Sequence, residues 1–261
     1  MMTQTLHIVL PQFQYLLVIL VRIGGIMAAM PIVGNRSVPP TVRVGLALGL
    51  SGALLPVVTV PALPEEPLHL VLGLAAEFLV GAVIGIALQS LFAGIGLAGE
   101  LMSTQMGFGA VQLLDPTTSH QESLVANLYT IFASLIFLSM DAHLLVVQVV
   151  ATSFDLVAPF GTGLSANLMD DIVRLSQGLF LIALKMAAPV MVTILLVNLG
   201  MAVMGRSVSQ MNVFLLSQPL TITAGLLTMG FALPYTFSLY ESEFIHLEEL
   251  LHDLMRMMGH G

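Results

Sequence analysis

The sequence has 261 residues, of which 57% are hydrophobic and only 8% are charged. Since a soluble domain carries about a quarter of its residues charged, a chain of this composition would expose large apolar patches in water. The formal net charge of −8 disfavours nucleic acid as a partner, and the absence of cysteine excludes disulfides and thiolate metal sites. The composition predicts an integral membrane protein or the buried part of a larger assembly.

Long apolar runs predict six helical spans, because a membrane helix needs about 20 apolar residues. The spans lie at roughly 6–33, 42–62, 68–98, 123–151, 172–204 and 213–237. Strand alternation is not seen over these lengths, and no cleavable signal peptide is expected, since the first 21 residues lack a basic n-region and a small-residue cleavage site. The predicted fold is an all-α membrane protein of about six long helices, broken or kinked in places, with an irregular central loop.

Arginines in the turns indicate an orientation. Arg36, Arg43 and Arg206 lie in turns that the positive-inside rule places in the cytoplasm, whereas the turn with Glu65 and Glu66 is acidic. Six spans with both termini outside satisfy every turn except the central one. After residue 240 an apolar stripe predicts an amphipathic helix that stays in water; it comprises Leu247, Leu250, Leu251, Leu254 and Met258.

The segment 99–116 interrupts the apolar pattern. It holds three glycines and two methionines, with Glu100 near its start and Asp115-Pro116 at its end. Irregular backbone at membrane depth is tolerated only where it is buried in protein or lines a water-filled path. This segment is therefore the first candidate for function.

Charged and polar residues inside the spans are the next candidates. Glu77 and Lys185 each sit in an apolar run, where a charge costs about 2.5–3.5 kcal/mol at mid-bilayer, so each marks a functional site or the two pair with each other. Asp141 and His143 suggest a metal site or proton relay, but two residues apart on a helix they point in different directions. A polar contact at a helix end is the simpler explanation for both residues.

Other motifs carry weaker signals. His246, Glu249 and His252 share a helical face, which zinc ligation or an exposed acidic helix could explain, and the second is simpler, so no metal is expected. The GxxxG pairs at 45–49 and 81–85 predict close helix packing. The sequence has no GxSxG, Walker A or HExxH motif, so we expect no enzyme activity and no cofactor.

A series of motifs in fixed order resembles the FliR family of flagellar biosynthetic export-gate proteins and its virulence-secretion relatives. Two positions depart from the family pattern: Ser209 stands where proline is common, and Ala142 stands where glycine is common. The series covers nearly the whole chain and reads Arg22, Pro31-Ile-Val-Gly34, Val38-Pro39, Arg43, Glu77, Gly81, Gly85, Gly99-Glu100, Gln105-Met-Gly-Phe108, Asp115-Pro116, Asp141-Ala-His143, Ser153-Phe154, Pro159, Pro189, Arg206 and Gln210-Met-Asn212.

The resemblance implies a subunit of the type III secretion export gate in the bacterial inner membrane, at the flagellar basal body. FliR-like proteins join FliP-like and FliQ-like subunits, act with FlhA-like and FlhB-like components, and pass unfolded flagellar proteins. The assembled gate can be raised toward the periplasm. One domain, 1–261, then has a FliP-like portion at 1–170, a FliQ-like hairpin at 171–240 and an amphipathic tail at 241–261.

The same resemblance assigns residues to two functional elements. A plug loop at 100–122 closes the channel, and its gating residues are Met102, Gln105, Met106, Gly107, Phe108, Gly109, Asp115 and Pro116. A turn at the cytoplasmic mouth contains Arg206, Gln210 and Asn212. Glycine permits tight backbone approach and methionine forms an adaptable apolar seal, which suits a plug.

Two other classes of function stay open. A secondary transporter of a small solute could use Glu77, Asp141 and Lys185 near the bilayer midplane. A purely structural subunit would anchor the gate without lining its path.

Overall fold

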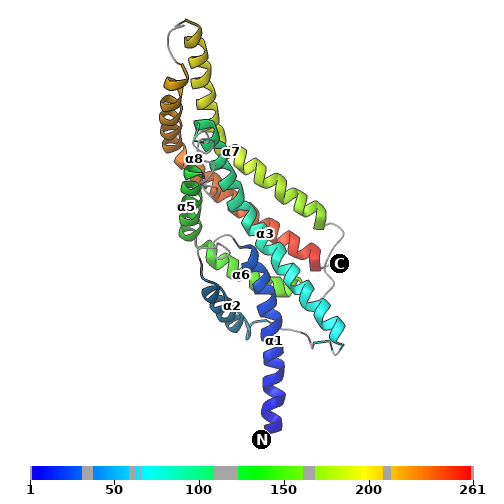
Figure 1. The fold of residues 1–261 in the computed structure, drawn as a ribbon. Helices are drawn as coiled ribbons and strands as arrows, with labels where there is room; N and C mark the ends of the chain where they lie inside the picture. Colours follow the sequence, from blue (N-terminus) through cyan, green and yellow to red (C-terminus); the bar gives the residue numbers. More distant parts are fainter. Residues whose placement is uncertain are drawn as a thin grey trace. The chain divides into compact units, whose positions relative to one another are not determined.

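The computed structural model describes residues 2–30, 38–58, 61, 63–64, 66–108, 123–160, 168–207 and 213–259. Within these ranges the chain is helical and contains no strand, which confirms the predicted all-α fold. The helices follow one another as α1 (Met2–Ala29), α2 (Pro40–Leu54), α3 (Pro67–Met106), α5 (Leu124–Ser139), α6 (Ala142–Leu156), α7 (Leu168–Ser207) and α8 (Val213–Gly259) (Figure 1).

Several of these helices are long and apolar enough to cross a membrane. Among the described residues they are α1, α3, α7 and α8, and the bent pair α5 and α6 makes a fifth if it counts as one span. Both α3 and α7 have 40 residues, which at 1.5 Å per residue is about 60 Å, twice the hydrocarbon core of a bilayer. Their apolar composition therefore identifies membrane helices but does not define how deep each one sits.

Two predicted spans differ from the helices found. The span at 42–62 contains only α2, whose 15 residues reach about 22 Å and fall short of the bilayer core, because Pro56 follows the helix end within two residues. The span at 123–151 is broken between α5 and α6 at Asp141, whose φ of 54° lies in the left-handed region and cannot continue a helix.

The C-terminal residues form no separate helix. Instead α8 continues for 47 residues through Pro219 and Pro234. Most of the predicted apolar stripe is buried, namely Leu247, Leu251, Leu254 and Met258, together with Met255. The stripe was predicted correctly from the sequence, but it packs against protein instead of lying free in water.

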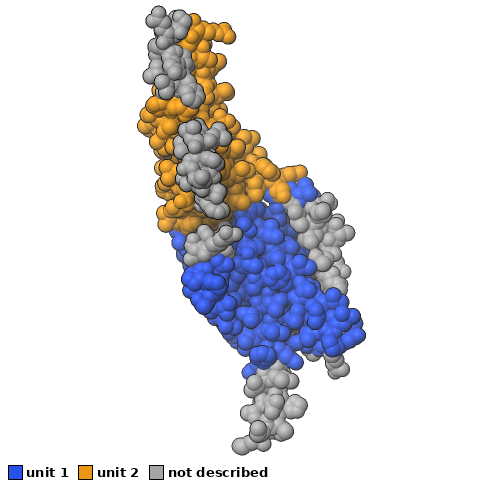
Figure 2. Space-filling model, viewed as in Figure 1, with its two compact units in different colours: residues 1–90, 138–175, 246–261 blue, residues 91–137, 176–245 orange. Residues whose placement is uncertain are grey.

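The chain divides into two compact units (Figure 2). Unit 1 comprises residues 1–90, 138–175 and 246–261, and unit 2 comprises residues 91–137 and 176–245. Because α3 and α8 pass from one unit to the other, the chain cannot be cut into these units at a single point. The predicted division at residue 170 concerns likeness to partner subunits, which this division into units does not test.

Close helix packing in unit 1 depends on glycine. A Cβ atom at Gly81 would overlap the carbonyl oxygen of Arg22, and one at Gly85 would lie 2.6 Å from the carbonyl oxygen of Ile26, so α1 and α3 touch through their backbones. The predicted packing role of this GxxxG pair is confirmed. Among the described residues, no atom lies within 4 Å of a Cβ added at Gly45 or Gly49, the other pair, on α2.

Unit 2 has an aromatic core. Phe92 of α3 meets Phe137 of α5 edge-on, with ring centroids 5.4 Å apart, and meets Tyr240 of α8 at 6.4 Å. Phe137 in turn packs edge-on against Phe244 at 5.8 Å. Edge-to-face pairs fix ring orientation as well as burying area, so this cluster joins three helices rigidly.

Candidate functional site

The start of the predicted plug loop is anchored at the end of α3. Gly107, with φ of 92°, follows the last helical residue, and its amide donates to Thr104 O at 3.1 Å. Met106 is fully buried, and its carbonyl oxygen lies 3.2 Å from Thr221 Oγ1 of α8. The Met106 side chain lies against Gly225, where a Cβ would come within 2.7 Å of two of its atoms. The chain is therefore fastened to α8 where it leaves the helix.

The far end of the same loop returns close to its start. Ser123 precedes α5, and its amide points to the Glu100 carboxylate at 3.4 Å. Next to Glu100 on α3, a Cβ at Gly99 would overlap the backbone of Ala126. Ser123 thus lies beside α3 at Glu100, within the same helix that the chain leaves after Met106. Glycine at position 99 permits this close approach.

The predicted gating residues divide between described and undescribed parts of the chain. Met102 and Met106 are fully buried, Phe108 is half-buried, and Gln105 is exposed. Gly107 forms the turn after α3, whereas Gly109, Asp115 and Pro116 lie outside the described residues, as do Gln210 and Asn212 of the predicted mouth turn. Arg206, also of that turn, is exposed in the last turn of α7.

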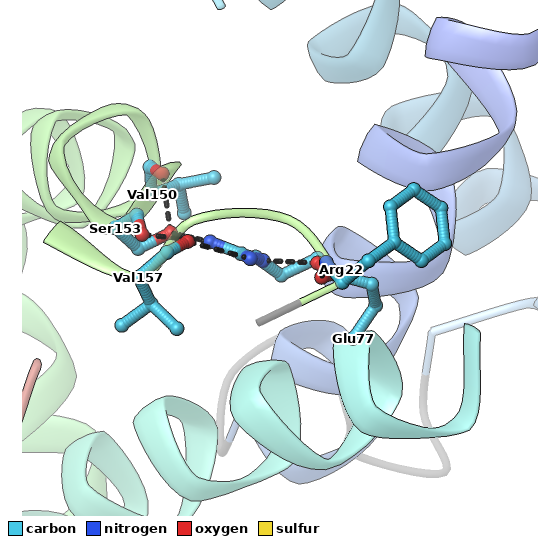
Figure 3. Close-up of polar contacts among 6 residues, drawn as sticks. Arg22, Glu77, Val150, Ser153 and Val157 are labelled. Atoms are coloured by element: carbon cyan, nitrogen blue, oxygen red, sulfur yellow. Dashed lines mark hydrogen bonds and ion pairs between the residues drawn. The ribbon is translucent and has the colours of Figure 1, made fainter. Parts of the chain in front are cut away.

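Arg22 and Glu77 form a buried ion pair that the sequence analysis did not predict (Figure 3). Arg22 Nε donates to Glu77 Oε2 at 2.7 Å, and neither side chain is more than 2% exposed. Arg22 Nη1 and Nη2 donate to the carbonyl oxygens of Ser153 and Val157, at 2.7 and 3.0 Å. The pair therefore links α1, α3 and the end of α6.

The remaining bonding capacity of this ion pair is also used. Glu77 Oε1 accepts from the Phe160 amide at 3.0 Å, and the guanidinium lies 4.1 Å from the ring centroid of Phe154. A buried charge pair is tolerated when further hydrogen bonds satisfy its free atoms. These contacts assign Glu77 a structural partner within unit 1.

The predicted pairing of Glu77 with Lys185 is wrong. Lys185 Nζ on α7 instead contacts Glu243 Oε1 on α8 at 2.9 Å, within unit 2. Asp141 and His143 are both exposed, and Asp141 makes no side-chain capping bond at the start of α6. Of the three residues of the transporter alternative, Glu77 and Lys185 are thus each paired with another residue of their own unit, and Asp141 is exposed.

The described residues contain no group of three or more histidine, aspartate or glutamate side chains that could hold a metal ion. His246 Nδ1 lies 3.7 Å from Glu249 Oε2, and both side chains are more than 70% exposed. This is the geometry of neighbours on an exposed helical face, the simpler of the two explanations considered for them.

Comparison with known proteins identifies the family. The family model for bacterial export proteins, family 1, matches residues 13–247. The chain belongs to the FliR family of bacterial export proteins. It is 29% identical to flagellar biosynthetic protein FliR of Pectobacterium carotovorum subsp. carotovorum, with 92% of each chain covered.

Further relatives extend this likeness to distant bacteria. Identity to flagellar biosynthetic protein FliR of Bacillus subtilis is 28%, over 95% of this chain and 96% of the relative. For the protein of the same name from Aquifex aeolicus, identity is 31% over 82% of this chain and 83% of the relative. The FliR resemblance of the sequence motifs is confirmed. Membership makes the chain a membrane component of flagellar protein export. The family consists of transport components and not of known enzymes.

Proposed function

We propose that this chain is a subunit of the flagellar type III export gate and forms part of the inner-membrane channel for unfolded flagellar proteins. FliP-like and FliQ-like subunits complete the channel, and FlhA-like and FlhB-like components act with it at the basal body. Family membership over residues 13–247 supports the assignment. The observation that carries the gating role is the anchoring of the loop after Met106 at both of its ends.

The anchored loop suits a plug for a physical reason. A plug has to yield to an extended polypeptide and then return to one closed position. Since Met106 is held to α8 at Thr221 and Ser123 is held to α3 at Glu100, the stretch between Met106 and Ser123 can be displaced without separating the helices that carry it. The loop thus has a fixed base on α3, α5 and α8.

This geometry changes the role that we assign to the two methionines. Met102 and Met106 are fully buried within unit 2, where they pack against protein. Methionine fills irregular spaces because its side chain is unbranched and flexible. We assign these residues to the base of the plug, and we assign the seal itself to residues further along the loop.

The two long C-terminal helices fit the second part of the proposed subunit. Together α7 and the first half of α8 supply two consecutive apolar helices that correspond to the FliQ-like hairpin at 171–240. Arg206 stands at the end of α7, where a cation also complements the helix dipole. We therefore propose that the turn after Arg206 lies at the cytoplasmic mouth.

Deletion of residues 110–114 tests the plug while it leaves Met106 and Ser123 in place. In planar bilayers, the gate purified with its co-expressed membrane partners should conduct ions continuously when the deletion is present, because the seal is lost. The parent gate should stay closed. An intact complex with unchanged conductance would reject the sealing role.

A second experiment separates a channel subunit from a purely structural one. A photocrosslinking amino acid at Gln105 or Phe108 should attach to an export substrate that is stalled by a folded domain at its end. A probe at the exposed Phe231 of α8 serves as the control. The absence of substrate crosslinks at both Gln105 and Phe108 would favour the anchoring subunit.

A further inference from the structure

Within unit 2, α3 differs from the other helices in the side chains that it exposes. Between Leu91 and Met106, a stretch that the structure describes in full, α3 exposes no large apolar side chain. The other three helices of the unit each expose several, such as Leu135 of α5, Leu195 of α7 and Phe231 of α8. Large apolar side chains suit a surface that lipid tails cover, so the exposed face of α3 is of another kind.

The exposed face of α3 in unit 2 is small and polar. Ala93, Glu100 and Thr104 are exposed, and Gly96 is half-buried. Because these residues follow one another at spacings of three and four, they share one side of the helix over a length of about 17 Å. We call these four residues the polar stripe. An exposed polar stripe on an otherwise apolar helix is the reverse of what a lipid-facing helix presents.

Asn127 of α5 extends this polar surface beyond α3. Asn127 is exposed, and its backbone amide donates to Ser123 O, one turn earlier, at 2.9 Å. The Ser123 amide in turn points to the Glu100 carboxylate at 3.4 Å. Next to Asn127, Ala126 packs against Gly99, the neighbour of Glu100. Glu100 and Asn127 therefore lie along the same seam between α3 and α5.

The carboxylate of Glu100 restricts what can cover the polar stripe. Charged side chains in membrane helices almost always face a bundle interior or a water-filled cavity. Glu100 stays exposed although it accepts from the Ser123 amide, so its charge has to be solvated. Lipid tails would remove that solvation. The small residues Ala93 and Gly96 would let a partner helix come close, but such a contact would bury the charge unless the partner brought a cation. Water solvates it without one.

We propose that the polar stripe and Asn127 form a wall of the water-filled path and face the unfolded polypeptide in transit. This inference rests on the proposed channel function and adds which side of the subunit forms the wall. Thr104 lies three residues before Gly107, where the chain turns into the loop, so the wall leads directly to the plug. A wall without large apolar side chains offers an unfolded chain little surface to adhere to, and apolar and polar segments therefore pass alike.

Single cysteines test the wall, because the chain has no cysteine of its own. Ala93→Cys, Thr104→Cys and Asn127→Cys are placed one at a time in the gate, which is purified with its membrane partners and held in lipid nanodiscs. None of the three replaces Glu100, so its contact with Ser123 is kept. The reagent is a positively charged, membrane-impermeant methanethiosulfonate, which reacts with the thiolate. Mass spectrometry of this chain measures the label, and the parent chain is the blank.

The matched controls are cysteines at exposed apolar positions of the same unit. Leu135 on α5 and Leu195 on α7 are 57% and 66% exposed, so exposure in the isolated chain alone would make both positions reactive. The wall cysteines should react at least about 10-fold faster than Leu135→Cys and Leu195→Cys, because the thiolate forms readily only in contact with water. Equal rates at wall and control positions, or no reaction at Ala93→Cys and Thr104→Cys, would overturn the proposal.

A stalled export substrate tests the contact with polypeptide. The wall cysteines should lose most of their reactivity when substrate occupies the gate, whereas Glu66→Cys, at an exposed position before α3, should keep it. Unprotected wall cysteines in a gate whose substrate crosslinks to a probe at Phe108 would overturn this inference and leave the channel function standing. Absence of substrate crosslinks at Phe108 and Gln105 would reject the channel function and this inference with it, so the two failures are distinguishable.

Discussion

Arg22 and Glu77 stand 55 residues apart in the sequence, yet the guanidinium and the carboxylate meet at 2.7 Å in the interior of unit 1. The pair is held by backbone groups from a third segment, since Ser153 and Val157 each offer a carbonyl oxygen to Arg22. This geometry joins three parts of the chain that are far apart in sequence. Loss of the ion pair should therefore destabilise the fold as a whole and not only remove a single contact.

Removal of one partner leaves the other charge buried and uncompensated. We expect Glu77→Leu and Arg22→Met each to destabilise the chain by about 3–5 kcal/mol, whereas the double variant Arg22→Met/Glu77→Leu loses less than the sum of the two. Thermal unfolding in detergent measures this. Glu66→Gln is the control, because that carboxylate pairs with His69 at the surface and should contribute less than about 1 kcal/mol. Additive losses at Arg22 and Glu77 would contradict a coupled pair.

Glycine positions with identical sequence patterns should respond in opposite ways. Gly81→Ala places a Cβ on the Arg22 carbonyl oxygen and should cost about 1–3 kcal/mol by forcing α1 away from α3. Gly45→Ala meets no atom of the described residues within 4 Å and should be neutral or stabilising by up to about 1 kcal/mol, since alanine favours the helix. Unfolding of the two single variants in the same detergent compares them directly. Equal losses would show that α2 is packed in a way that the chain alone does not reveal.

The helices could be predicted from local sequence, whereas the partners of buried charges could not. Apolar runs of membrane length produced α1, α3, α7 and α8, because helix formation in an apolar phase depends on the residues of one segment. The pairing of Glu77 depends on segments up to 135 residues distant from Arg22 along the chain. Arg22 was itself a detectable signal, as a charge in an apolar run, but nothing local distinguished it from Lys185 as the partner of Glu77.

The same contrast holds for the anchored loop: its irregular character could be predicted from local sequence, whereas its partners could not. Its glycines and methionines marked it as irregular and buried, and the family motifs marked it as a plug. Neither pattern indicates that Thr221 and Gly225 of α8 receive Met106, because the hydrogen bond between Met106 and Thr221 joins residues 115 apart.

The break between α5 and α6 should depend on the backbone of Asp141. At a φ of 54° glycine is free of the steric cost that other residues bear, so Asp141→Gly should stabilise the chain by about 0.5–1 kcal/mol. Asp141→Asn should be nearly neutral, because asparagine tolerates this region. Asp141→Val should be destabilising. Thermal unfolding of the three variants gives the order, and a stabilising valine would contradict a left-handed residue at this break.

Substitutions at the ion pair of Lys185 and Glu243 distinguish a gate subunit from a transporter. The Lys185 side chain is 41% exposed, and such pairs contribute less than about 1 kcal/mol. Lys185→Met should therefore leave swimming in soft agar near the parent level in a strain without its own copy of the gene, and so should the exchange Lys185→Glu/Glu243→Lys. A transporter that uses this amine would lose activity in both. Complete loss of motility with a normal amount of folded protein would revive that alternative.

The fit between Met106 and Gly225 should control how tightly the plug closes. A larger side chain at Gly225 would displace Met106 and loosen the base of the loop, with an overpacking cost of about 1–3 kcal/mol. We expect Gly225→Leu to raise the resting ion conductance of the assembled gate, although every residue of the loop is unchanged. Gly230→Leu, on the same helix, is the matched control, because no atom in the described part of the chain lies within 4 Å of a Cβ added there. Equal conductance in the two variants would show that the contact of Met106 with Gly225 does not control sealing, because only Gly225→Leu disturbs that contact.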